Sequence, residues 1–188
     1  EYRKPQIGVS TVRILRVDGV AQPAWEVHVY AETTVGVYQR LMEAGAMHGL
    51  KDTGMRAYET LRVEAGLSRW GADFAHDCGV DEAGVAHLVD KTKSAFIGQG
   101  AMASRANGKG RRMTLLSIQG ARTNPWGGEI VVKDGRDAGF VTSGAYAQAD
   151  GTCLVLARVD GPAAKAGAKF EVEIFGERHP ATVVDRAV

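Results

Sequence analysis

The residues best suited to ligand chemistry in this sequence are charged side chains in the segment 54–66, which a glycine closes at each end. Arg56, Glu59 and Arg62 are three residues apart, so on a helix Glu59 can pair with either arginine. An arginine can also bind a carboxylate through two parallel hydrogen bonds and stack on a flat ring. Spacing alone favours a simpler role for Arg56, an exposed pair with Glu59 that contributes about 0.2–0.5 kcal/mol. Arg56 is therefore a candidate for binding a planar anionic ligand, and Arg62 a candidate for a buried structural partner.

Other residue clusters give weaker indications of chemistry. Four potential metal ligands lie near one another in the sequence: His76, Asp77, Cys78 and His87. No second close pair of ligands follows at zinc-finger spacing, so we expect no metal site. Gly108–Gly110 is not a phosphate-binding loop, because glycine stands where Ser or Thr must bind magnesium. No serine or histidine has the context of a nucleophile elbow, so the residues predict no catalytic nucleophile.

Length and composition are those of an ordinary soluble protein. The chain has 188 residues, of which 45% are apolar and 24% charged, enough for one large domain or two small ones. A net charge of +1 gives no field that would attract nucleic acid or an anionic membrane, and no apolar run approaches the roughly 18 residues of a membrane span. Cys78 and Cys153 are far apart and belong to no CxxC pair, which favours a reducing compartment. We therefore expect a cytoplasmic protein without nucleic-acid or membrane partners.

Two strands and a helix are predicted before the segment that carries Arg56. Ser10–Val17 and Trp25–Tyr30 alternate in polarity, which is typical of paired half-buried strands. Turn signals at Asp18–Gly19 and Gln22–Pro23 separate them. Thr33 or Thr34 can cap a helix that runs to about position 48, with an inner stripe of Val37, Tyr38, Leu41, Met42 and Gly45.

The next helix is predicted over residues 55–65, and Gly66 supplies its left-handed end. Met55, Tyr58, Leu61 and Ala65 recur every three or four residues, so we expect them to form its packing face. A third, short helix is expected near Asp81, because Asp81 and Glu82 suit a helix N-terminus.

A change in composition predicts a domain boundary after these helices. The segment 98–112 is rich in glycine and basic residues, among them Lys109, Arg111 and Arg112, and is interpreted as a solvated linker. Six short β-rich runs follow: Met113–Ile118, Glu129–Val132, Gly139–Thr142, Cys153–Val159, Phe170–Ile174 and Ala181–Val184. Turn signals such as Asp134–Gly135, Asp150–Gly151 and Gly176 separate them. The predicted class is α+β, with an antiparallel sheet and helices on one face in residues 1–110 and a small antiparallel β-barrel in residues 111–188.

Four spaced motifs resemble those of a known family. They are R-A-x-E-T-L-R-x-E-A-G-L-x-x-W-G from Arg56, followed by Asp73; Asp81–Val85; Lys93–Gly98; and Gly139–Gly144, followed by Tyr146. In this order they are similar to the folate-dependent aminomethyltransferases, which include the T-protein of the glycine cleavage system and the folate-binding part of dimethylglycine and sarcosine dehydrogenases. The resemblance covers roughly residues 10–186 and aligns with the C-terminal half of such an enzyme.

The resemblance implies a cofactor and the residues that bind it. The cofactor is tetrahydrofolate, with FAD only if a separate N-terminal oxidoreductase domain exists. The arginine at the position of Arg56 contacts folate in this family. The turn that contains Gln22, Trp25 and Glu26 matches the family's Gly-Glu-x-Gly-Trp/Phe-Glu, so these three are implied as further cofactor-binding residues. Gln22 replaces the glutamate that accepts hydrogen bonds from the pterin, and the lost charge is expected to cost about 1–3 kcal/mol, or roughly 10- to 100-fold in affinity.

The resemblance also implies an activity. This chain would be the C-terminal portion of an enzyme that transfers a one-carbon unit from a methylated amine or aminomethyl donor to tetrahydrofolate, and its partners are the folate and that donor. The family's catalytic aspartate precedes the matched region, so we expect no catalytic residue here, and no activity without the missing N-terminal half of the protein. Gln22 supports an alternative, a non-catalytic binding or assembly module of the same fold that has lost folate. An RNA-associated protein of this fold is disfavoured by the net charge of +1.

Two features of the barrel segment have open interpretations. Thr142 and Ser143 lie in the Gly139–Gly144 motif, which is interpreted as architectural, with its hydroxyls bonded to local backbone groups. Trp126 either packs in the core or covers the mouth of a pocket.

Overall fold

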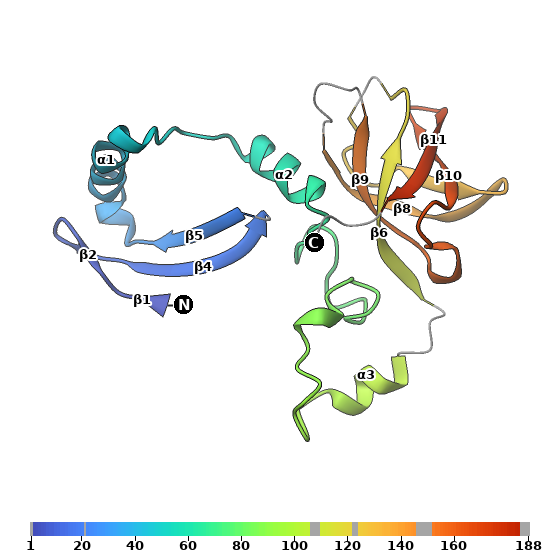
Figure 1. Ribbon diagram of the computed structural model, residues 1–188, viewed down its shortest axis with the longest axis horizontal. Coiled ribbons are helices and arrows are strands. Elements are labelled where there is room, and N and C mark those ends of the chain that lie inside the picture. Colours follow the sequence, from blue (N-terminus) through green and yellow to red (C-terminus); the bar gives the residue numbers. More distant parts are fainter. Residues whose placement is uncertain (1, 21, 106–109, 122–123, 146–151, 185–188) are drawn as a thin grey trace. The chain divides into compact units, whose positions relative to one another are not determined.

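The computed structural model describes residues 2–20, 22–105, 110–121, 124–145 and 152–184 (Figure 1). Ala21, Lys109, Tyr146 and the predicted turn at Asp150–Gly151 lie outside these residues. The chain forms two compact units, residues 1–58 and 59–188, which are described separately. Antiparallel sheets with helices are followed by a closed six-stranded antiparallel barrel, which confirms the predicted fold class. The predicted domain boundary at residue 110 stays a prediction.

A long hairpin is the main feature of the first unit. β4 (Arg13–Val20) pairs with β5 (Gln22–His28), and β1 (Tyr2–Arg3) pairs with the other edge of β4. β2 (Gln6–Ile7) and β3 (Ser10–Thr11) form a separate two-stranded sheet.

The turn of this hairpin is shorter than the sequence predicted, and its strands are longer. Val20 pairs with Gln22, so the turn falls inside the interval marked by Asp18–Gly19 and Gln22–Pro23, but these flanking residues belong to the strands. A register shift between Val17 and Val20 admits the extra residue into β4, and pairing then continues to the tip. A glycine inside a strand often marks such a bulge.

The predicted helix after the hairpin is confirmed in three consecutive pieces. They are η1 (Ala31–Thr33), α1 (Thr34–Gly45) and η2 (Ala46–His48), and Gly49 ends the last piece with φ of 71°. The expected threonine cap is not formed, because the hydroxyls of Thr33 and Thr34 both donate to the carbonyl of Tyr30 at 3.1 Å. On the expected inner stripe of α1, Val37 is buried, whereas Tyr38 and Leu41 are exposed.

The packing face of α2 (Met55–Glu64) differs from the prediction. Met55 and Leu61 are 66% and 48% exposed, whereas Arg62 and Val63 are almost fully buried. The predicted face is therefore only partly right: Ala65 is buried. The helix is buried mainly through Arg62, which makes polar contacts, and Val63, which belongs to an apolar cluster with barrel residues such as Leu115 and Leu156. Gly66, with φ of 68°, ends the helix as expected.

The expected helix near Asp81 was also wrong, since the chain forms turns there and a short 3-10 helix, η3 (Ala86–Leu88). The side chain of Glu82 accepts a hydrogen bond from the Gly79 amide at 2.8 Å, and its carbonyl accepts one from the Met113 amide at 2.8 Å. A carbonyl bonded to a neighbouring strand cannot continue a helix ladder. α3 (Gln99–Arg105) follows, within the segment that was interpreted as a linker.

The second unit contains the barrel (Figure 1). Its strands close in the order β10-β11-β6-β9-β8-β7. Their bounds are β6 (Arg111–Ile118), β7 (Ile130–Lys133), β8 (Arg136–Ala145), β9 (Cys153–Asp160), β10 (Lys169–Ile174) and β11 (Glu177–Val184). All six predicted runs are strands. Their inward-facing apolar side chains, such as Leu116, Val155 and Val172, form one buried cluster.

Two of the barrel hairpins have the tight turns that their sequences indicate. Asp134 and Gly135 have φ of 50° and 76° and join Lys133 directly to its partner Arg136. Phe175 and Gly176 repeat this geometry with φ of 50° and 82°. Positive φ at both central residues is typical of a type I′ turn, whose twist matches that of the strands.

Candidate functional site

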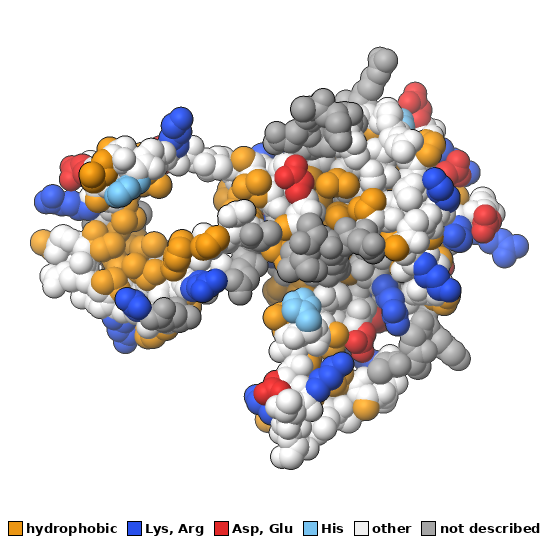
Figure 2. Space-filling view, in the orientation of Figure 1, with side chains coloured by type: hydrophobic (Ala, Val, Ile, Leu, Met, Phe, Trp, Pro, Cys, Tyr) orange, Lys and Arg blue, Asp and Glu red, His pale blue; other side chains and the backbone are white. Residues whose placement is uncertain are grey.

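The predicted binding residues of the hairpin lie on two faces of β5. Gln22, Trp25 and Glu26 are all exposed, and Trp25 pairs with Arg16 while Glu26 pairs with Leu15. Side chains alternate along a strand, so Gln22 and Glu26 share one face and Trp25 lies on the other. Figure 2 shows hydrophobic side chains gathered over the hairpin of the first unit, and its strands contribute exposed Trp25 and Val27.

Arg56 lies in the first turn of α2, and its side chain is exposed. The structure therefore leaves the guanidinium accessible to a ligand. Folate contacts by Arg56 and the three hairpin residues stay predictions.

Arg62, six residues further along the same helix, is the centre of a buried network in the second unit. Its side chain is 2% exposed and lies 2.6 Å from a carboxylate oxygen of Asp73, which is fully buried. It also donates to Glu59 at 2.7 and 3.1 Å and to the carbonyl of Leu67 at 2.6 Å. Arg69 forms an ion pair with the other oxygen of Glu59 at 2.6 Å. The charges alternate from Asp73 through Arg62 and Glu59 to Arg69, so the network is neutral overall.

The barrel motif completes this network. Ser143 accepts a hydrogen bond from Arg62 at 2.9 Å, and Thr142 donates to Asp73 at 2.6 Å. The Thr142 hydroxyl also lies 3.1 Å from the carbonyl of Leu156 on the neighbouring strand β9. The expectation that these hydroxyls bond to local backbone groups was therefore wrong, because they join β8 to α2, to β9 and to the loop that contains Asp73. The carboxylate of Asp73 accepts a third hydrogen bond from the Arg69 amide at 2.8 Å, so its two oxygens bind groups from α2, from β8 and from its own loop.

Sequence reasoning placed Arg62 correctly as a buried partner but did not identify Asp73 as its counter-charge. The available signal was position: Asp73 lies two residues after the W-G pair that ends the Arg56 motif. An aspartate in a loop gives no indication of burial by itself, and only the packing of the loop against β8 reveals it.

A cavity of about 510 Å³ lies beside this network. Its walls include the rings of Phe74 and Phe140, and its polar groups include Asp73 and Thr142. Trp126 is also part of the lining and is 66% exposed, so it is not a core residue.

An ion pair at the edge of this cavity joins Asp77 to Arg158 at 2.6 Å. The hydrogen bond from Arg158 lowers the pKa of Asp77 below its usual value. The Arg158 guanidinium also lies 5.7 Å from the centre of the Phe140 ring. These contacts hold the loop against the barrel.

A second cavity of the same unit, about 390 Å³ in volume, is mainly apolar. Its lining residues include Cys78, Phe96, Ile97, Met102 and Arg105. Burial raises the pKa of the Cys78 thiol, so this cysteine lacks the lowered pKa of a reactive nucleophile.

Within the described residues, no group of three or more His, Cys, Asp or Glu side chains is arranged to hold a metal ion. None of the helices in those residues is long and apolar enough to cross a membrane.

Comparisons with known proteins match both parts of the chain. Residues 1–93 match the family model described as the GCVT N-terminal domain, and residues 111–188 match the glycine cleavage T-protein C-terminal barrel domain. An aminomethyltransferase from Nostoc sp. is 35% identical over 92% of this chain and 45% of its own length. Mitochondrial dimethylglycine dehydrogenase from Mus musculus is 31% identical over 92% of this chain but only 20% of its own length.

A solved structure has the same fold. The glycine cleavage system aminomethyltransferase T from Bartonella henselae superposes with a TM-score of 0.82 and 22% identity, covering 98% of this chain and 51% of that one. The chain thus spans about half the length of the aminomethyltransferases it matches and a fifth of the dimethylglycine dehydrogenase.

Proposed function

Because this chain belongs to the aminomethyltransferase family of the glycine cleavage T-protein, we propose that it is the folate-contacting portion of a one-carbon transferase. The reaction would move a one-carbon unit from a methylated amine or an aminomethyl donor to tetrahydrofolate. The observation that carries the proposal is the match of both segments, in order, to the two T-protein family models. Relatives named aminomethyltransferase and dimethylglycine dehydrogenase support it.

Within this proposal, three exposed residues of the first unit would contact the cofactor. Gln22 and Glu26 share one face of β5, and their side-chain oxygens can accept hydrogen bonds from the amino and ring N–H groups of a pterin. Arg56 carries a guanidinium that suits the carboxylates of the folate tail or the flat ring. Trp25 lies on the opposite face of the strand, so it would not meet the same side of the ligand as Gln22.

The chain itself would contribute binding and orientation. Holding the folate nitrogen and the one-carbon donor in reacting geometry converts a bimolecular step into an effectively unimolecular one. The family's catalytic aspartate lies outside the matched half, so the residues of this chain would not supply the catalytic group. The buried Arg62–Asp73 network would keep α2 fixed to the barrel while the exposed first turn of the helix meets the ligand.

Titration of the full-length protein with 5-formyltetrahydrofolate tests the proposal. We expect saturable binding that Arg56→Ala weakens about 10- to 100-fold, as the loss of a charged hydrogen bond would. Gln22→Glu restores the carboxylate of the family motif and should strengthen binding by a similar factor. Arg40→Ala is a matched control, because Arg40 is an exposed arginine on α1 that pairs only loosely with Glu43 at 3.5 Å.

One observation favours a second function, a binding or assembly module that has lost folate. Gln22 lacks the charge of the family glutamate, and Pro23 follows it. The same titration distinguishes the two functions. No saturable folate binding, either in the parent or after Gln22→Glu, would favour the module.

A further inference from the structure

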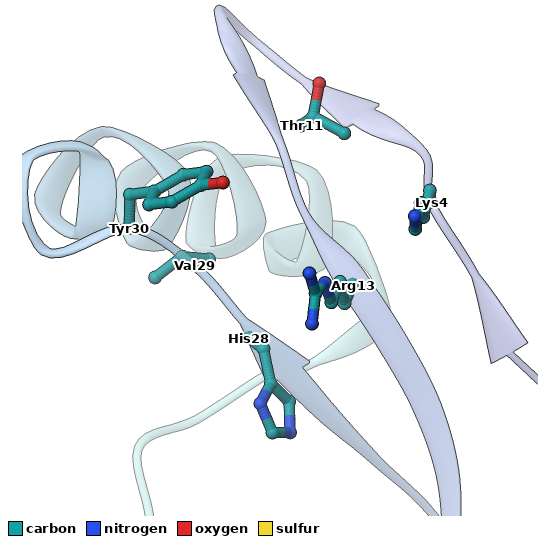
Figure 3. A pocket seen from close by; sticks show the side chains of 6 residues that line it. All are labelled: Lys4, Thr11, Arg13, His28, Val29 and Tyr30. Carbon is teal, nitrogen blue, oxygen red and sulfur yellow. The ribbon is translucent and has the colours of Figure 1, made fainter.

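The first unit contains a cavity that the proposed folate contacts do not use. It has a volume of about 340 Å³ and lies where β4 begins and β5 ends (Figure 3). Six side chains line it: Lys4, Thr11, Arg13, His28, Val29 and Tyr30. They come from β3, β4, the end of β5 and the segments that follow β1 and β5.

Strand register explains why these side chains converge. Arg13 and His28 are direct partners across the hairpin, so both project from the same face. Arg3 is paired with Ile14. Because successive side chains alternate between the two faces, Lys4, the next residue, projects from the same face as Arg13. A hydrogen bond of 3.0 Å from the Val12 amide to the Pro5 carbonyl holds the segment after Lys4 against the start of β4.

The cavity presents hydrogen-bond donors and positive charge. Lys4 and Arg13 are cationic, and Thr11 and Tyr30 contribute hydroxyls. In the part of the chain that the structure describes, neither Lys4 nor Arg13 forms an ion pair with a carboxylate. Glu26 lies 3.0 Å from the His28 ring but is not part of the lining.

The cavity is separate from the hairpin tip. Gln22 and His28 are six residues apart on one strand, which corresponds to about 20 Å. A pterin held at Gln22 would therefore leave this cavity open to another group.

We propose that this cavity binds a compact anion, the carboxylate or phosphate group of a small molecule. Two cations that form no ion pair with a carboxylate among the described residues attract an anion, and the planar guanidinium of Arg13 can bind two of its oxygens at once. Lys4 adds a point charge, and the hydroxyls of Thr11 and Tyr30 can donate to the remaining oxygens. Because the lining is exposed, binding depends on ionic strength and is strongest at low salt.

Calorimetric titration of the full-length protein at low ionic strength tests the proposal, with inorganic phosphate in one arm and succinate in the other. Saturable millimolar or tighter binding is expected in at least one arm, and the stronger arm identifies the anion class. Arg13→Gln should weaken it about 10-fold or more, and Lys4→Gln is a second, independent variant. Arg16→Gln is the matched control. Arg16 is an exposed arginine on the same strand, but it is the cross-strand partner of Trp25 and projects from the face that does not carry Arg13.

Absence of saturable binding in both arms would overturn the proposal. The proposal would also be overturned if neither Arg13→Gln nor Lys4→Gln changed the affinity for the anion. The same holds if Arg16→Gln weakened binding as much as Arg13→Gln does. Circular dichroism of each variant establishes that the fold is retained. The outcome is independent of folate binding, because no folate is present in either arm.

Discussion

Replacing Asp73 with asparagine removes the counter-charge of the most deeply buried cation in the described chain. Arg62 is 2% exposed and lies 2.6 Å from Asp73, which also accepts hydrogen bonds from Thr142 at 2.6 Å and from the Arg69 amide at 2.8 Å. Asparagine preserves the shape but carries no charge, and only one of its two terminal atoms is an acceptor. The variant therefore leaves a buried guanidinium with a single carboxylate partner, Glu59.

The expected loss of stability follows from these contacts. Removing one partner of a buried ion pair costs about 3–5 kcal/mol. Arg62 keeps Glu59, the Leu67 carbonyl and Ser143, so we expect the lower end, about 3 kcal/mol. For a unit of residues 59–188, this corresponds to a decrease in Tm of roughly 10–15 °C.

Urea denaturation followed by tryptophan fluorescence measures this change. A Trp25→Phe background removes the first unit's tryptophan, so Trp70 and Trp126 report only on the second unit. Asp160→Asn is the matched control, because Asp160 is 56% exposed and lies 3.7 Å from Arg111, a surface pair that contributes less than about 1 kcal/mol. If Asp73→Asn lowered the free energy of unfolding no more than Asp160→Asn does, the structural role of the network would be refuted.

Two further predictions concern the barrel. Gly139→Ala should destabilise the second unit by about 2–4 kcal/mol, because a Cβ there would meet the Arg158 carbonyl oxygen of β9 at 2.1 Å and Gly139 has φ of 153°. Gly135→Ala has open space around the new methyl group and should cost only about 1–2 kcal/mol in the same denaturation assay; equal losses would contradict the clash. Burial raises the pKa of the Cys153 thiol to about 11, so at pH 8 almost no reactive thiolate is present. In a Cys78→Ser background, Ellman's reagent should therefore label Cys153 only after unfolding, and rapid labelling of the folded protein would show that the thiol is accessible.

Local signals in the sequence determined most of the secondary structure. Asp134–Gly135 forms a two-residue turn because both positions need positive φ, which Asp and Gly tolerate. In the turn at Phe175–Gly176 only the glycine is a local signal, because a bulky residue such as Phe175 rarely adopts positive φ. The six barrel strands and the helix over 34–45 follow from alternation and periodicity, which depend only on neighbouring residues. Spaced motifs were sufficient to identify the family, and that identification is confirmed by both family models.

Tertiary structure decided which faces of these elements are used. The periodicity of α2 predicted an apolar packing face, but the buried side of the helix is that of Arg62, whose partners Asp73 and Ser143 come from distant parts of the chain. Burial of a charge depends on such partners, and no local pattern contains them. In the same way, only the strand register puts Trp25 on the face opposite Gln22 and Glu26, and brings Lys4 beside Arg13 and His28. The sequence by itself determined most of the secondary structure elements and the family, and long-range pairing decided which side chains contact one another.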